Sequence, residues 1–226
     1  MNGYPTVIVW DLDGTLIDSA LDLAQALNRQ LREHGRAGLD ENLVRTMIGD
    51  GVAKLIEWGF AAGGHRMCGP ELEDLIPRFM TIYSACATDN TRLYAGAQQV
   101  LEHFSNAGVR QGICTNKPEG VTRQILSDLS IADYFGAVIG GDTTPAKKPD
   151  PLPLISCLDA LNATHEQSIF IGDTGVDVAT ARAAGIPIGI VTFGYARKAV
   201  TDLAADFLID NLDTMPMFIN ELRAAG

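Results

Sequence analysis

The stretch Thr6–Thr15 reads TVIVWDLDGT, an apolar run that ends abruptly in two aspartates separated by a leucine. Its first five residues are short, uninterrupted and rich in β-branched side chains, which is typical of a strand buried on both faces of a sheet. Asp11 and Asp13 follow at once, and in an extended chain alternate residues point to the same side. The stretch therefore predicts a central strand whose end presents two carboxylates together.

Downstream of Ala95, helical periodicity alternates with short apolar runs. Helices are expected over residues 97–106, 119–129, 151–161 and 176–184. Strands are expected over residues 109–114, 137–139, 168–171, 186–192 and, more weakly, 206–209, with a closing helix after them. Repeated βα units with right-handed crossovers predict an α/β fold with a doubly wound parallel sheet, and the strand at 6–10 belongs to that sheet.

The segment between the first strand and this repeat has helical spacing alone. Ala20, Leu23, Ala24, Leu27 and Leu31 share one face of a helix that ends near Gly35. The same spacing recurs at Leu72, Leu75, Ile76 and Phe79, and no strand is expected between residues 35 and 90. We therefore expect an α/β core domain of residues 1–16 and 92–226, with a small helical domain of residues 17–91 inserted after the first strand.

The charge balance limits the classes of partner. The 226 residues carry 17 basic and 28 acidic side chains, a net charge of −11, which opposes both nucleic acid and an anionic membrane surface. No apolar run approaches the 18 or so residues of a transmembrane helix, and no basic leader opens the sequence. The four cysteines, Cys68, Cys86, Cys114 and Cys157, form no CxxC pair, so we expect free thiols and a cytoplasmic location.

Polar residues close four of the predicted elements, at the edge where open parallel sheets bind ligands. They are DLDGT at 11–15, TNKP at 115–118, KKPDP at 147–151 and GDTGVD at 172–177. Asp11, Asp13, Asp173 and Asp177 should therefore converge. Clustered carboxylates repel unless a cation lies among them, and Mg²⁺ is the usual ion where a phosphate shares the site. Lys148 and the backbone N–H groups of the Gly14 turn would add positive charge for an anionic substrate.

These four motifs, in this order and register, resemble those of the haloacid dehalogenase-like hydrolase superfamily. The resemblance implies a Rossmann-like core, makes the inserted helices a cap domain, and predicts a Mg²⁺-dependent phosphatase that acts on a small anionic metabolite. IGDG at 48–51, together with TNKP and KKPDP, is most similar to the phosphoglycolate phosphatases. That similarity favours 2-phosphoglycolate as the substrate.

The resemblance also implies roles for individual residues. Asp11 is the expected nucleophile, which forms an aspartyl-phosphate, and Asp13 the acid and base that serves the leaving alcohol and the attacking water. Thr115 and the backbone N–H of Asn116 would hold phosphoryl oxygens, and Lys148 would balance charge. The metal ligands would be Asp11, the backbone carbonyl of Asp13, Asp173 and Asp177, the last either directly or by orienting Lys148 or a water. Substrate contacts are further expected from Gly14, Lys117, Gly49, Asp50 and Gly51.

Simpler interpretations compete with these roles. Asp173 and Asp177 are also good residues to begin a helix, Lys147 is a rival to Lys148, and Lys117 is also consistent with a solvated lysine. Other functions remain open: a phosphosugar mutase, a phosphatase for another sugar phosphate, or a silent binder of phosphometabolites. Thr15, where related mutases often have a hydrophobic residue, favours a phosphatase, and the presence of Asp13 disfavours a dehalogenase. The oligomeric state is left open.

Overall fold

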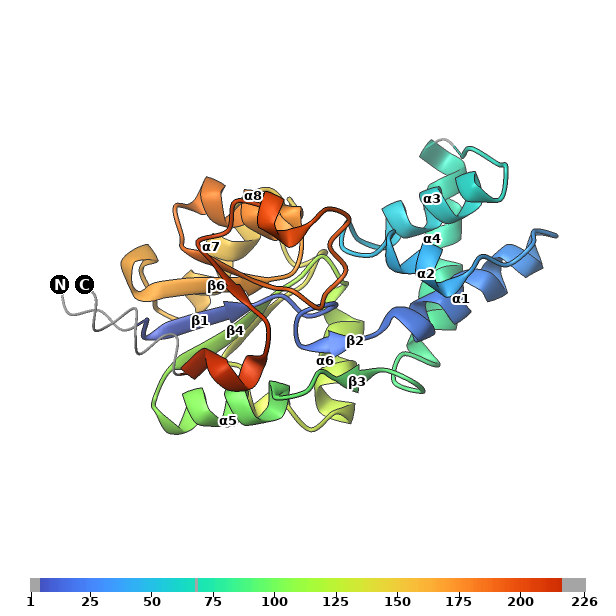
Figure 1. Cartoon of the computed structure of the whole chain (residues 1–226). Coiled ribbons are helices and arrows are strands. Elements are labelled where there is room, and N and C mark those ends of the chain that lie inside the picture. The colour runs from blue at the N-terminus through green and yellow to red at the C-terminus, as the bar shows by residue number, and fades with distance from the viewer. Residues whose placement is uncertain (1–4, 68, 217–226) are drawn as a thin grey trace.

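The computed structural model describes residues 5–67 and 69–216, and its centre is a six-stranded parallel sheet in the order β5-β4-β1-β6-β7-β8 (Figure 1). The strands are β1 (Val7–Trp10), β4 (Arg110–Cys114), β5 (Ala137–Ile139), β6 (Ser168–Gly172), β7 (Ile188–Val191) and β8 (Phe207–Ile209). The predicted strands agree with these bounds to within two residues at either end. The fold class predicted from the sequence is confirmed.

Strand β1 lies in the middle of the sheet because both of its faces are covered. All four of its side chains are buried, and they alternate between two hydrophobic cores, with Val7 and Val9 in one and Ile8 and Trp10 in the other. Trp10 is level with Ile113 of β4 and with Ile171 of β6 in the parallel register. The residues that follow these three strands therefore emerge side by side at one edge.

Helices cover both faces of this sheet. Helices α5 (Ala97–Asn106) and α6 (Glu119–Asp128) contribute to the core that contains Ile8, whereas α7 (Leu152–Ala160) and α8 (Gly175–Ala184) contribute to the core that contains Val7. The two pairs lie on opposite sides of the sheet in Figure 1. This arrangement is doubly wound, as the alternation of periodicities predicts.

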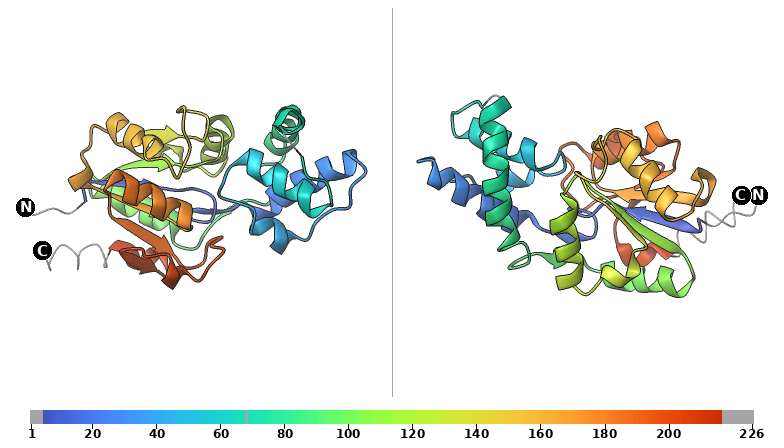
Figure 2. Two further views of the ribbon diagram at one scale, coloured as in Figure 1. Left: turned by 90° about the horizontal axis from the view of Figure 1, so that it is seen from above. Right: turned by 180° about the vertical axis from the view of Figure 1, so that it is seen from behind.

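Four further helices lie apart from the sheet, beyond the ends of its strands (Figures 1 and 2). They are α1 (Ala20–Glu33), α2 (Glu41–Arg45), α3 (Val52–Ala62) and α4 (Gly69–Ser84). Helices α1 and α3 approach closely at Gly59, where a β-carbon would lie 2.7 Å from a methyl of Leu27. The helical character of this segment agrees with the sequence analysis.

A short ribbon joins the helices to the sheet and was not predicted. Strands β2 (Ile17–Asp18) and β3 (Arg92–Leu93) pair antiparallel, with Ile17 opposite Leu93 and Asp18 opposite Arg92. Strands of two residues have no periodicity, so the sequence pattern does not predict them. The ribbon holds the outgoing and returning chain together between the two parts of the molecule.

Two expectations, the closing helix and the state of Cys68, lie outside the described residues. Cys86, Cys114 and Cys157 are free thiols, as expected for these three. Across residues 5–67 and 69–216, no helix combines the length and apolarity needed to cross a membrane.

Candidate active site

The loops after β1, β4, β5 and β6 bring most of the predicted site residues to one place. Asp11, Thr115, Lys148 and Asp173 are all buried there, with exposed fractions of 5% or less. In the sequence these residues are up to 162 positions apart, from residue 11 to residue 173. The parallel register explains their meeting, because Asp11 directly follows Trp10 while Thr115 and Asp173 follow the neighbouring strands.

Lys148 is the buried cation of the site. Its Nζ lies 2.9 Å from Asp11 Oδ1 and 2.6 Å from Asp177 Oδ1, and only 1% of its side chain is exposed. Burial alone would lower the pKa of Lys148, but Asp11 and Asp177 outweigh burial and raise the pKa above its usual value. Lys148 therefore stays charged, whereas its rival Lys147 has an exposed side chain.

Asn116 fixes the backbone of Lys148. Its Oδ1 accepts from the Lys148 N–H at 2.9 Å, and its Nδ2 donates to the Lys148 carbonyl and to the Gly49 carbonyl, each at 3.0 Å. The backbone N–H of Asn116 has no hydrogen-bond acceptor among the described residues. Asn116 thus ties three loops together while keeping one N–H available to a ligand.

Three buried carboxylates, those of Asp11, Asp173 and Asp177, form the acidic side of the site. Each contributes an oxygen to a group in which all lie within 4.8 Å of one another. Burial is the main cause that raises the pKa of Asp11 to about 6 and the pKa of Asp173 well above its usual value, and repulsion from Asp177 adds to both. Bringing these groups together as anions is therefore unfavourable without more positive charge than Lys148 supplies.

A divalent cation fits this group of oxygens. Asp173 Oδ1 is buried and has no hydrogen-bond partner among residues 5–67 and 69–216, so a lone pair there is unused. Carboxylate and carbonyl oxygens are the ligands of hard divalent ions such as Mg²⁺. The acidic group could therefore hold a divalent metal, as the sequence predicts.

Glycine is required at position 14 by the approach of Asp173. Gly14 has φ +88°, and a β-carbon there would lie 2.1 Å from Asp173 Oδ2. The same oxygen accepts a hydrogen bond from the Tyr195 N–H at 2.6 Å. The turn after β1 can thus lie directly against Asp173 only because residue 14 lacks a side chain.

Asp177 combines the two interpretations that the sequence left open. Its Oδ2 accepts from the N–H of Thr174 at 2.9 Å and from the Thr174 hydroxyl at 2.8 Å, so it caps helix α8. Its Oδ1 binds Lys148. One side chain therefore begins the helix and orients the buried lysine.

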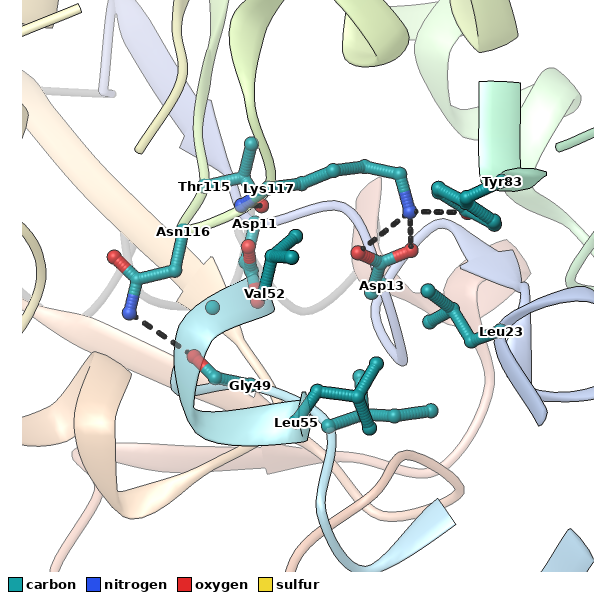
Figure 3. A pocket seen from close by; sticks show the side chains of 12 residues that line it. Asp11, Asp13, Leu23, Gly49, Val52, Leu55, Tyr83, Thr115, Asn116 and Lys117 are labelled. Atoms are coloured by element: carbon teal, nitrogen blue, oxygen red, sulfur yellow. Dashed lines mark hydrogen bonds and ion pairs between the residues drawn. The ribbon is translucent and has the colours of Figure 1, made fainter. Parts of the chain in front are cut away.

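The Asp13 carboxylate points toward Lys117 and Tyr83 and not toward Asp11, as Figure 3 shows. Lys117 Nζ lies 2.8 Å from Asp13 Oδ1 and 3.0 Å from Oδ2, and it donates to the hydroxyl of Tyr83 at 2.6 Å. The Ser19 hydroxyl also donates to Asp13 Oδ1, at 2.5 Å. Only 3% of the Lys117 side chain is exposed, so the interpretation of Lys117 as a solvated lysine is wrong.

Tyr83 and Ser19 were not identified from the sequence. Tyr83 lies on α4, and Ser19 immediately precedes α1. Neither belongs to one of the four motifs, and the periodicity around Tyr83 indicates only a buried helix face. Their position over the ends of the strands identifies them, and that position is visible only in the structure.

These residues enclose a small cavity between the sheet and the helices (Figure 3). The loop after β4 lines it with Thr115, Asn116 and Lys117, and the loop before α3 lines it with Gly49 and Gly51. Leu23 of α1 and Val52 and Leu55 of α3 provide an apolar cover. Its volume is about 30 Å³, which leaves room for no more than about two water molecules. A phosphomonoester is larger than this space.

Asp50 does not join this cavity, although it was predicted to contact substrate. Its carboxylate forms an ion pair with the Arg197 guanidinium, which also donates to the Ile48 carbonyl at 3.1 Å and lies 4.6 Å from the centroid of the Trp58 ring. The loop after β7 thereby holds the loop before α3. In this arrangement Asp50 connects the helices to the sheet, while Gly49 and Gly51 of the same loop line the cavity.

Comparison with known proteins shows the family of this chain. The family model of the haloacid dehalogenase-like hydrolases matches residues 8–191, and the chain belongs to that family. It is therefore an enzyme with a hydrolase fold, and the resemblance of the four motifs is confirmed.

The particular relatives are phosphoglycolate phosphatases. The chain is 41% identical to one from Cereibacter sphaeroides, over 96% of this chain and 99% of the relative, and 38% identical to one from Rhodospirillum rubrum, over 93% and 89%. A crystal structure of a predicted phosphoglycolate phosphatase from Haemophilus somnus superposes with a TM-score of 0.88 at 27% identity, covering 95% of this chain and 98% of that one. Within its family, the chain is similar to phosphoglycolate phosphatases.

Proposed function

We propose that this protein is a Mg²⁺-dependent phosphatase that hydrolyses 2-phosphoglycolate through an aspartyl-phosphate formed on Asp11. The observation that carries the proposal is the buried arrangement of Asp11, Lys148 and the acidic group beside a cavity that Asp13 also lines. The names of the similar proteins support the choice of substrate.

Asp11 is the group proposed to attack phosphorus. One of its oxygens is bound to Lys148, which keeps the carboxylate in place and offsets the charge of an incoming phosphoryl group. The Thr115 side chain and the free N–H of Asn116 line the same wall and would hold phosphoryl oxygens. Attack moves the phosphoryl group to Asp11 and releases the alcohol, and water then displaces the phosphate from Asp11.

Asp13 is proposed to handle the protons of both steps. It lies on the helix side of the cavity, where the leaving oxygen of a substrate whose phosphoryl group is positioned at Asp11 would lie (Figure 3). It gives a proton to that oxygen, and then takes one from the water that attacks the aspartyl-phosphate.

The metal is proposed to be held by Asp11, Asp173 and the backbone carbonyl of Asp13, with Asp177 in the same acidic group. When bound, Mg²⁺ supplies positive charge that stabilises the phosphoryl oxygens and offsets the buried carboxylates. This assignment is supported by Asp173 Oδ1, a buried oxygen that has no hydrogen-bond partner among the described residues.

We further propose that residues 17–91 act as a cap domain over a core of residues 1–16 and 92–226. The cover that Leu23, Val52 and Leu55 place over the cavity supports this role, because a closed cap excludes water that would compete for the phosphoryl group. The β2–β3 ribbon is the hinge in this proposal, because the two connections between the cap and the core pass through it side by side.

The experiment that tests the function is phosphate release from 2-phosphoglycolate beside a hexose phosphate and a pentose phosphate, with Mg²⁺ and with the metal chelated. We expect kcat/KM for 2-phosphoglycolate to exceed the others by at least about 100-fold, and chelation to lower its turnover by a similar factor. Faster release from a sugar phosphate would move the substrate and keep the mechanism. Interconversion of sugar phosphates without release would indicate a mutase, and saturable binding without turnover would indicate a silent binder.

Cap closure predicts a change in hydrogen exchange. Because the helices must open to admit substrate, backbone amides of residues 36–90 should exchange several-fold more slowly when Mg²⁺ and vanadate, a phosphate analogue, are bound. Amides of α5, on the far part of the sheet, serve as the internal control and should not change. Unchanged exchange in residues 36–90 would contradict a moving cap.

A further inference from the structure

Tyr83 reaches from the helices into the cavity next to Lys117. It is fully buried on α4 and stacks on Phe79, with ring centroids 5.8 Å apart and planes 25° apart. The Lys117 Nζ lies 4.7 Å from the centroid of the Tyr83 ring and 2.6 Å from its hydroxyl oxygen. The packing therefore fixes where the hydroxyl lies, and Figure 3 shows it at the end of the cavity where the Lys117 side chain ends.

The O–H of Tyr83 is an unused hydrogen-bond donor. It accepts from Lys117, and no hydrogen bond that it donates occurs among the described residues. Burial raises the pKa of Tyr83 above its usual value, so the oxygen keeps its proton. A buried donor without an acceptor costs free energy, and a ligand that accepts from it removes that cost. Tyr83 lines the cavity, so a ligand in the cavity could accept this hydrogen bond.

The ligand group that fits this position is a carboxylate. Lys117 supplies an ammonium and Tyr83 an O–H at the same end, while the phosphoryl position lies at the other end between Asp11 and Asn116 (Figure 3). A carboxylate there would accept from the unused Tyr83 O–H and lie beside the Lys117 ammonium, whose own N–H groups are directed at Asp13 and Tyr83, whereas an alkyl group would leave the Tyr83 O–H without an acceptor. Leu23 and Leu55 line the cavity between these two ends, and its small volume of about 30 Å³ favours a short ligand.

We propose that Tyr83 is a specificity-determining residue, which donates a hydrogen bond to the carboxylate of a short phosphorylated carboxylic acid while Lys117 pairs with its charge. This inference rests on the proposed function and deepens it. Tyr83 selects the substrate by the group at the end opposite the phosphate. A phosphomonoester of equal length without a carboxylate gains nothing from the hydroxyl.

The test compares Tyr83→Phe with the wild type on 2-phosphoglycolate and on ethyl phosphate, which replaces the carboxylate by a methyl group. We expect kcat/KM for 2-phosphoglycolate to fall about tenfold to a hundredfold, mainly through KM, because a hydrogen bond to a charged group is lost. The value for ethyl phosphate should change by less than about twofold. Tyr134→Phe, in the single-turn helix η1 (Ala132–Tyr134) and outside the cavity lining, is the matched control and should change neither.

Each outcome has a separate meaning. An equal loss on both substrates indicates a structural effect and overturns the inference, as does an unchanged kcat/KM for 2-phosphoglycolate, while the proposed function stands in both cases. No release from 2-phosphoglycolate by the wild type overturns the proposed function itself.

A binding measurement addresses the carboxylate position without turnover. Glycolate has the carboxylate but no phosphate, and its titration followed by NMR should give an apparent Kd about tenfold higher for Tyr83→Phe than for wild type. Equal glycolate affinities would overturn the inference whatever the phosphatase assay shows.

Discussion

Asp11→Asn is expected to lower kcat for 2-phosphoglycolate by at least about 10⁴-fold, because an amide of the same shape cannot accept the phosphoryl group. Asp11 has no substitute for this role in the proposed mechanism. Asp13, the other carboxylate that lines the cavity, is bound through both oxygens by Lys117 and turned toward the helices. Phosphate release measured with Mg²⁺ checks the prediction, with the exposed Asp133→Asn as the control.

The fold should survive this substitution. Burial raises the pKa of Asp11 to about 6, so above that pH the metal-free protein holds a buried anion at a cost, and without that charge Lys148 still pairs with Asp177 at 2.6 Å. The Tm of Asp11→Asn at pH 7.5 without metal is therefore expected to equal or exceed that of the wild type. Undiminished phosphate release by a folded Asp11→Asn would contradict its role as the nucleophile.

Lys148→Met is expected to damage both activity and stability. The substitution leaves Asp11 and Asp177 without the ammonium that lies 2.9 Å and 2.6 Å from their oxygens. Breaking a buried ion pair by removing one partner costs about 3–5 kcal/mol, which for a chain of this size lowers Tm by roughly 6–20 °C. We expect kcat to fall by about 10³-fold as the charge on the phosphoryl group is no longer offset.

Lys147→Met separates this effect from a general loss of charge in the same loop. Its side chain is exposed and adjacent in sequence, so we expect Tm within about 1 °C of wild type and kcat within about twofold. Addition of Mg²⁺ should restore part of the Tm lost in Lys148→Met, since the carboxylates then share a cation. A Lys148→Met protein as stable and active as Lys147→Met would contradict the role given to the buried lysine.

The strand ends could be predicted because they depend on local pattern and on one rule of parallel sheets. The apolar run before Asp11 makes β1 central. The parallel register with β4 and β6 then places Thr115 and Asp173 beside Asp11, independently of the loop conformations. The glycine at position 14 likewise follows from the turn, although its contact with Asp173 is visible only in the structure.

The helix side of the site could not be predicted because it depends on how two parts of the chain pack. The ribbon of Ile17–Asp18 and Arg92–Leu93 sets the placement of α1–α4, and it is too short to have a pattern. The Lys117 side chain is held by its hydrogen bond to the Tyr83 hydroxyl. Tyr83 lies on α4, a helix that carries none of the four motifs. For the same reason the pairing of Asp50 with Arg197 has no local signal in the sequence.

The central claim is that Asp11 accepts the phosphoryl group, and trapping the covalent intermediate tests it most directly. Wild-type enzyme turning over phosphorus-labelled 2-phosphoglycolate with Mg²⁺ would be quenched in acid, where acyl phosphates survive briefly, digested, and its labelled peptide identified by mass spectrometry. The account predicts label on the peptide that contains Asp11, and none in Asp11→Asn. Rapid turnover with no protein-bound label at any quench time, or label on a different residue, would contradict it.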